Sequence, residues 1–91
     1  MVGGNVMPCI SSFYGLLIYM YGDDHNPPHF HINFGGEWSI CDLEGNIIEG
    51  NLPSSKQKLI IAWAELHHDE LLANWELAKN KETLVKIMPL Q

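Results

Sequence analysis

The hydrophobic periodicity of this chain changes once, at Pro53. Before this proline, apolar residues form short runs, the clearest with a period of two, and turn residues separate the runs, as in antiparallel β-strands. After it, apolar residues recur at steps of three and four, as on one face of a helix. The order of these patterns predicts an α+β domain. A length of 91 residues leaves room for one hydrophobic core.

The clearest strand covers residues 29–34, where Phe30, Ile32 and Phe34 alternate with two histidines and an asparagine. Gly35-Gly36 follows it, a pair that suits a two-residue hairpin. The sequence therefore predicts an antiparallel meander of four to five strands. Its strands are expected at about 13–21, 29–34, 37–43 and 46–51, and residues 84–87 could return as a last strand.

A single long helix is predicted over about 55–79, packed on one face of the sheet against the apolar side of 29–34. Ser54 and Gln57 match a capping box at its start. A helix of this length could bend near His68, where Asp69 could cap a second segment. Its apolar face is formed by Ile60, Trp63, Ala64, His67, Leu71, Trp75 and Ala78.

The other face of the sheet should carry His29, His31 and Asn33, and no predicted segment is left to cover it. Tyr19 and Tyr21 would add aromatic rings if they share this face. Polar aromatic surfaces of this kind are enriched at protein interfaces. We therefore expect these five residues to form a docking surface. This arrangement would put His67, a hydrogen-bonded core histidine in this interpretation, on the opposite side from His29.

The loop before this strand contains candidate metal ligands. Asp24, His25, His29 and His31 offer imidazole and carboxylate groups for a divalent transition metal such as zinc, iron or nickel, with Asp23 as an alternative carboxylate. The same residues are also ordinary components of a turn and of a solvated strand face, and in that case no cofactor is needed. Both interpretations stay open.

An enzymatic role has less support in the sequence than a binding role. The clustered histidines could exchange protons in catalysis, and they could also make an interface sensitive to pH. No serine stands in a nucleophilic motif, and neither Cys9 nor Cys41 lies near cationic residues that would activate a thiol. Two buried, reduced cysteines are the simpler expectation.

The charge of the chain restricts its partners. Five lysines oppose eleven acidic residues, there is no arginine, and the net charge is −6. This balance makes nucleic acid an unfavourable ligand. The acidic residues of the predicted helix form a solvated face that could also attract a basic partner, and they are Glu65, Asp69, Glu70 and Glu76. No segment has the length of a membrane span. A signal peptide would require basic residues near the N-terminus, and the first basic residue of this chain is Lys56. A cytoplasmic location is therefore expected.

Several motifs give the chain a family resemblance. Residues 24–31, with the order Asp-His-Asn-Pro-Pro-His-Phe-His, and residues 63–67, with Trp-Ala-Glu-Leu-His, are the most distinctive. Together with Met-Pro-Cys-Ile-Ser at 7–11, Phe-Tyr-Gly at 13–15 and the segments 70–72 and 74–75, they resemble the small bacterial family called domain of unknown function 4160. The likeness runs from about Met7 to Leu90.

The resemblance implies a cytoplasmic bacterial protein, often encoded beside another short protein in a toxin–antitoxin-like arrangement. It implies a domain over 7–91 that starts at the Met-Pro pair, with residues 1–6 as a flexible extension. It brings no established activity, so no catalytic residue is transferred. Relatives commonly carry basic residues around the start of the helix and after its Trp-Ala-Glu-Leu-His segment, where this chain has His68.

Two functions of different classes follow. The leading hypothesis is a small protein-binding or regulatory module whose open face docks a partner protein encoded nearby, or a second copy of the chain. The competing hypothesis is a metal-dependent hydrolase or nuclease that uses His25, His29 and His31 with Asp23 or Asp24.

Overall fold

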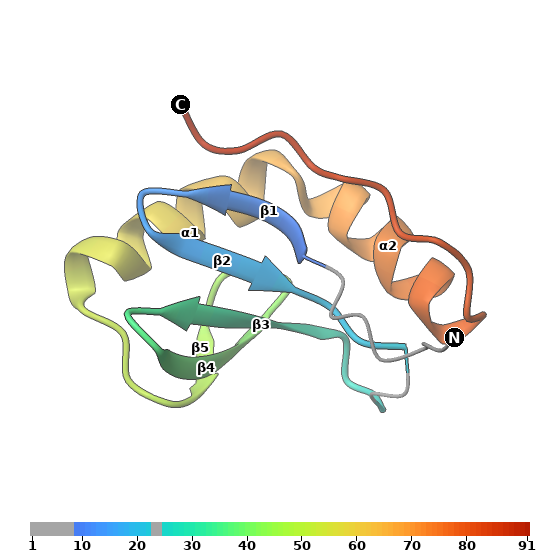
Figure 1. The fold of residues 1–91 in the computed structure, drawn as a ribbon, viewed down its shortest axis with the longest axis horizontal. Coiled ribbons are helices and arrows are strands. Elements are labelled where there is room, and N and C mark those ends of the chain that lie inside the picture. Colours follow the sequence, from blue (N-terminus) through green and yellow to red (C-terminus); the bar gives the residue numbers. More distant parts are fainter. Residues whose placement is uncertain (1–8, 23–24) are drawn as a thin grey trace.

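A computed structural model describes residues 9–22 and 25–91 of the chain, and within these residues it contains five strands and two helices (Figure 1). The predicted extension at 1–6 and the two aspartates at 23–24 lie outside the described residues. The elements are β1 Cys9–Phe13, β2 Leu16–Tyr19, β3 His29–Phe34, β4 Glu37–Asp42, β5 Ile47–Glu49, α1 Ser54–Leu66 and α2 His68–Lys79. The predicted α+β class is confirmed.

The strands form an antiparallel meander in the order β1-β2-β3-β4-β5. Gly35 and Gly36, with φ values of 60° and 88°, join β3 to β4 through the predicted two-residue hairpin. The strand 29–34 is confirmed at both ends, and the strand predicted at 37–43 ends one residue earlier. The strand predicted at 46–51 is shorter, because Gly50 turns the chain with φ 96° after Glu49.

The prediction of one strand over 13–21 is wrong. Tyr14 and Gly15 have φ values of 50° and 80° and form a hairpin between β1 and β2, in which Phe13 pairs with Leu16. The sequence pattern did not predict this turn, because a tyrosine occupies a position of positive φ that is usually taken by asparagine or glycine. The hairpin buries both Phe13 and Leu16 in the core.

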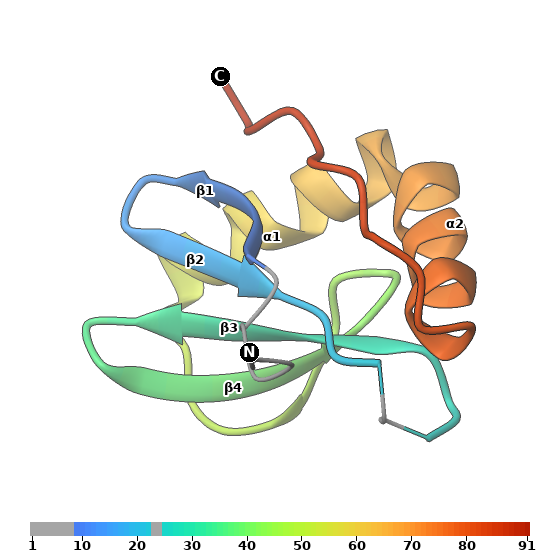
Figure 2. The same cartoon turned by 45° about the vertical axis from the view of Figure 1, so that its right-hand side comes forward.

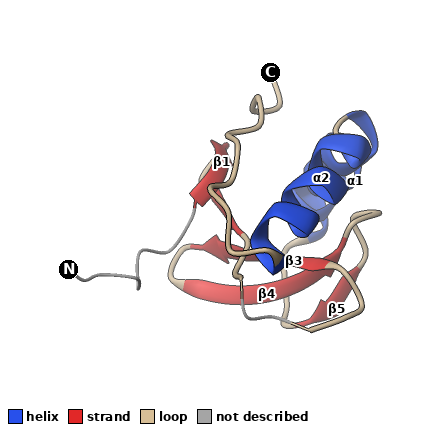
Figure 3. Ribbon diagram, turned by 90° about the vertical axis from the view of Figure 1, so that its right-hand side faces the viewer, coloured by secondary structure: helices blue, strands red, loops and turns tan. Residues whose placement is uncertain are grey.

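Both helices lie on the same side of the sheet, as Figures 2 and 3 show. Trp63 of α1 is fully buried at the centre of this layer. Its ring centroid lies 5.2 Å from that of Phe13 and 5.8 Å from that of Phe30. These contacts join the first and third strands to the helix, and burial of such large rings supplies much of the core of a small domain.

The predicted single helix over 55–79 is two helices, because the backbone leaves helical geometry at His67 (φ −119°, ψ 26°). The expected bend is therefore present, one residue before His68. The two proposed caps are wrong. Ser54 already lies inside α1, whose N-cap is Pro53, and neither helix has a side-chain cap hydrogen bond, so Asp69 does not cap α2. Asp69 instead lies in the first turn of α2, where its charge favours the helix dipole.

The C-terminal segment runs beside α2 and β1 (Figure 1) but forms no strand at 84–87. The side chain of Asn74 in α2 forms two hydrogen bonds with the backbone of Val85. Its amide N–H donates to the Val85 carbonyl at 2.7 Å, and its carbonyl oxygen accepts from the Val85 N–H at 2.9 Å. One backbone bond, from the Ile87 N–H to the Ile10 carbonyl, reaches β1. The side chain of Asn74 thus replaces part of the ladder that a further strand would need.

We expect Asn74→Ala to destabilise the domain by about 1–3 kcal/mol, because two backbone groups lose partners held by a buried amide. Urea unfolding measures the change. Asn80→Ala is the matched control, since Asn80 is exposed at the end of α2 and bonds through its backbone N–H. Equal stability of the two variants would contradict this account of the C-terminal segment.

Candidate functional site

A row of directly paired residues crosses the sheet on the side away from the helices. Tyr19 pairs with His31, His31 with Ile40, and Ile40 with Glu49. Residues directly opposite each other in antiparallel strands point to the same side of the sheet. The neighbouring residues Ile18, Ile32 and Cys41 are fully buried on the helix side. The alternation predicted for 29–34 therefore separates a packed side from a side that the two helices leave open.

Aromatic rings on this open side contact one another in pairs. The ring centroids of Tyr19 and Trp38 lie 5.3 Å apart, and those of Tyr21 and His31 lie 4.6 Å apart in an edge-on arrangement. His29 and His31, two residues apart on β3, have ring centroids separated by 5.3 Å. We call this surface the histidine–aromatic face, formed by Tyr19, Tyr21, His29, His31, Asn33, Trp38 and Ile40.

His29 departs from the expected separation of the two sheet faces. Its ring centroid lies 5.2 Å from that of Trp75, a buried residue of α2. His29 is the first residue of β3, so α2 can reach it around the end of the sheet. His67, by contrast, contacts the inner-layer residue Trp63, with ring centroids 5.8 Å apart. The histidine–aromatic face thus continues at one end into the helix layer.

The middle of the face contains an open hollow of about 530 Å³. Trp38, with 45% of its surface exposed, is the largest side chain there. Sequence reasoning missed Trp38 and Glu49, although the two-residue hairpin already implied the pairing of Asn33 with Trp38. The hollow is lined by Tyr21, His31, Trp38, Ser39, Ile40, Glu49 and Gly50.

Of the candidate metal ligands, the structure describes His25, His29 and His31 but not the two aspartates. The Nδ1–H of His29 can donate to the Pro27 carbonyl at 2.8 Å, which would leave Nε2 as the acceptor of the neutral ring. His25 lies exposed in the loop before β3. In the described part of the chain, no three His, Cys, Asp or Glu side chains are grouped closely enough to hold a metal ion. Because Asp24 lies outside that part, the metal site stays a prediction.

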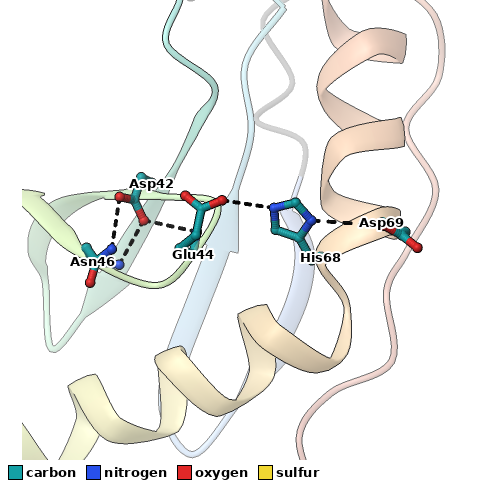
Figure 4. Close-up of polar contacts among 5 residues, drawn as sticks. All are labelled: Asp42, Glu44, Asn46, His68 and Asp69. Carbon is teal, nitrogen blue, oxygen red and sulfur yellow. Dashed lines mark hydrogen bonds and ion pairs between the residues drawn. The ribbon is translucent and has the colours of Figure 1, made fainter.

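The two helix histidines have structural partners. His67 is partly buried, and its Nδ1 lies 2.5 Å from a carboxylate oxygen of Glu70. The expected hydrogen bond is present, but His67 is not among the buried residues of the core. His68 Nε2 lies 3.0 Å from a carboxylate oxygen of Glu44 in the turn between β4 and β5 (Figure 4). The exposure of the His68 and Glu44 side chains limits what this pair adds to stability.

The turn that holds Glu44 is itself ordered by Asp42 (Figure 4). One carboxylate oxygen of Asp42 accepts from the backbone N–H groups of Glu44 and Asn46, at 3.0 and 2.9 Å. The turn also packs on α1, because a Cβ at Gly45 would lie 2.7 Å from the Cα of Ile61. These contacts connect the β4–β5 turn of the sheet to both helices, so we assign them a structural role.

Neither cysteine forms a disulfide, and Cys41 is unsuited to nucleophilic chemistry. Burial raises the pKa of the Cys41 thiol well above its ordinary range, and the charges of Asp42 and Glu44 raise the pKa further. The thiolate is the reactive form, so this environment keeps the sulfur inert.

We expect iodoacetamide at pH 8 to leave Cys41 unmodified in the folded protein and to alkylate it after unfolding in urea, as read by peptide mass spectrometry. Unfolding restores the ordinary pKa of 9.0, so the unfolded state loses this proton first as the pH rises. The contribution of Cys41 to stability is therefore full below pH 9.0 and declines above it. Half-buried Cys9 is the internal comparison, and alkylation of both thiols at one rate in the folded protein would contradict the prediction.

Within the described residues, neither helix is long and apolar enough to cross a bilayer. No curated protein and no solved structure shows significant similarity to the chain. Residues 15–76 match the family described as a domain of unknown function (DUF4160). This segment includes the β2–β5 strands, α1 and most of α2, and with them the histidine–aromatic face. The match confirms the family resemblance of the motifs at 24–31 and 63–67: the chain belongs to the family of domains of unknown function DUF4160.

Proposed function

We propose that the protein is a small binding or regulatory module and that its histidine–aromatic face docks a basic partner protein. The observation that carries the proposal is the surface opposite the helices, where tyrosine, histidine and tryptophan rings lie in mutual contact and Trp38 is 45% exposed. Tyrosine and tryptophan offer large, rigid contact areas with a polar tip, and such residues dominate binding energy at interfaces.

Charge favours a basic partner over a second copy of this chain. At a net charge of −6, two copies repel each other, whereas a cationic protein is attracted over the same distances. Glu49 extends the row of paired residues on this face with a carboxylate. The same charge makes nucleic acid an unfavourable ligand.

The proposed setting is the bacterial cytoplasm, with the partner encoded by a neighbouring gene in a toxin–antitoxin-like pair. This part of the proposal follows from what the family resemblance of the motifs at 24–31 and 63–67 implies, and the acidic charge of the chain fits a basic partner. It defines the first candidate to test, which is a short basic protein encoded beside this one.

The test uses the purified full chain and the product of the neighbouring gene, with affinity measured by calorimetry. We expect a complex that weakens with added salt and that Tyr19→Ala/His31→Ala weakens at least about ten-fold, because truncation removes central aromatic contacts. The control is Leu66→Ala/Leu72→Ala, which truncates two exposed leucines on the helices.

Circular dichroism of each variant verifies that the fold is retained. Equal binding by the two double variants would place the partner elsewhere and contradict the proposal. Sedimentation analysis of the chain alone tests whether a second copy of the chain binds the face. A tight homodimer that is disrupted by Tyr19→Ala/His31→Ala would show that the face binds a second copy and not a basic partner.

A metal-dependent hydrolase or nuclease is the second candidate function. It is favoured by one observation, the 2.8 Å contact between His29 Nδ1 and the Pro27 carbonyl. Metal-binding histidines commonly donate one ring N–H to a carbonyl in this way, which directs the other nitrogen to the ion. His31 would provide a second ligand from the same strand, with His25 and Asp24 as further candidates.

If this candidate is correct, tag-free protein incubated with zinc, iron or nickel salts should hold about one ion per chain, measured by plasma mass spectrometry. His29→Ala should lose the ion, because a divalent ion needs about four ligands and few are offered here. His68→Ala is the control, since His68 lies at the helix junction. No retained metal, or equal metal in both variants, would contradict a metal site at the loop and β3.

A further inference from the structure

The hollow on the histidine–aromatic face combines two kinds of chemistry. The rings of Trp38, Tyr21 and His31 line it together with Ile40, whose side chain occupies the position between His31 and Glu49 in the row. The carboxylate side chain of Glu49 belongs to β5, so the charge and the rings come from different strands. Aromatic rings, an apolar side chain and a carboxylate residue thus line one hollow of about 530 Å³.

This combination suits a planar cation. A cation over an aromatic face is attracted by the ring quadrupole, and the attraction grows when the site is partly shielded from water. A guanidinium group can stack on a ring while its edge N–H groups bond a carboxylate in a fork, which a compact ammonium cannot reproduce. The chain contains no arginine of its own, so no internal guanidinium competes for the hollow.

The fold already places one cation over a ring elsewhere. The ammonium group of Lys56 lies 5.5 Å from the centroid of Phe34, at the end of β3. Lys56 sits on α1, away from the hollow, so this contact serves the packing of the helix start on the hairpin.

We propose that the hollow is an arginine-binding site, in which the guanidinium of a partner protein stacks on Trp38 and bonds Glu49. This inference rests on the proposed docking function and names the side chain that the partner inserts. It explains why a large aromatic ring stays exposed in the same hollow as a carboxylate residue on an acidic protein: the guanidinium of the partner would contact both.

The test titrates ¹⁵N-labelled full chain with Nα-acetyl-arginine methylamide and follows the indole N–H of Trp38 by NMR. We expect saturable shifts with a dissociation constant on the order of millimolar, since a single side chain supplies only a small part of an interface. The citrulline analogue has nearly the same shape without charge and should shift the indole signal little. The lysine analogue tests the alternative cation and should bind several-fold more weakly.

Two variants with matched charge make the result specific. Glu49→Gln should weaken arginine binding about three- to ten-fold, because it removes the carboxylate partner of the guanidinium. Glu65→Gln removes the same charge from the exposed side of α1 and should leave binding unchanged. Trp38→Ala should abolish saturable binding, followed in this variant by the backbone amides of 38–41, while Trp38→Phe should retain part of it.

Equal shifts with the arginine and citrulline analogues, or equal effects of Glu49→Gln and Glu65→Gln, would overturn the arginine site. Its failure is distinguishable from failure of the docking proposal. A complex that is lost in Tyr19→Ala/His31→Ala but is unaffected by Glu49→Gln and Trp38→Ala would keep the docking face and remove the arginine site.

Discussion

Burial of Phe30 and Ile32 on the helix side decides on which face of the sheet each remaining side chain of β3 lies. Phe30 contacts Trp63 of α1, and Ile32 is fully buried in the same layer. Because side chains alternate along a strand, a shift of one residue would put the histidines in the core and these apolar residues in water. The cost of that exchange fixes the register of β3 and, through its pairing, the registers of β2 and β4.

The second constraint is the closure of the core by segments that follow the sheet. The helical path breaks at His67, which lets α2 take a direction different from α1 and lets Trp75 reach His29 at the end of β3. Asn74 then holds the C-terminal segment by its backbone, and the indole N–H of Trp63 donates to the Met88 carbonyl at 2.8 Å. A chain of this size needs such contributions from its last residues, because a small domain buries a limited share of its surface.

The histidine–aromatic face is the consequence of covering the sheet with both helices on one side. Its rings are held by ordinary cross-strand pairing, which needs no further element to position them. Trp38 and Glu49 come from β4 and β5, and their proximity to His31 depends on the meander order. The strands beneath this face are joined by backbone hydrogen bonds, and a surface that is ordered in this way before binding lowers the ordering cost that a partner must overcome.

The sequence alone determined the α+β class, the strand at 29–34 with its glycine hairpin, the open face with its histidines, and the family. These follow from periods of two and 3.6 residues and from motifs, which are properties of neighbouring residues. The sequence did not reveal the hairpin at Tyr14-Gly15, because an apolar run gives no sign that a tyrosine adopts positive φ. The length of the helix already suggested a bend near His68, but its position at His67 was decided by tertiary structure. The same holds for the hydrogen bonds between Asn74 and Val85 and for the hollow that Trp38 and Glu49 both line. Each of these depends on contacts between residues distant in sequence, and no local sequence pattern predicts the energy of such contacts.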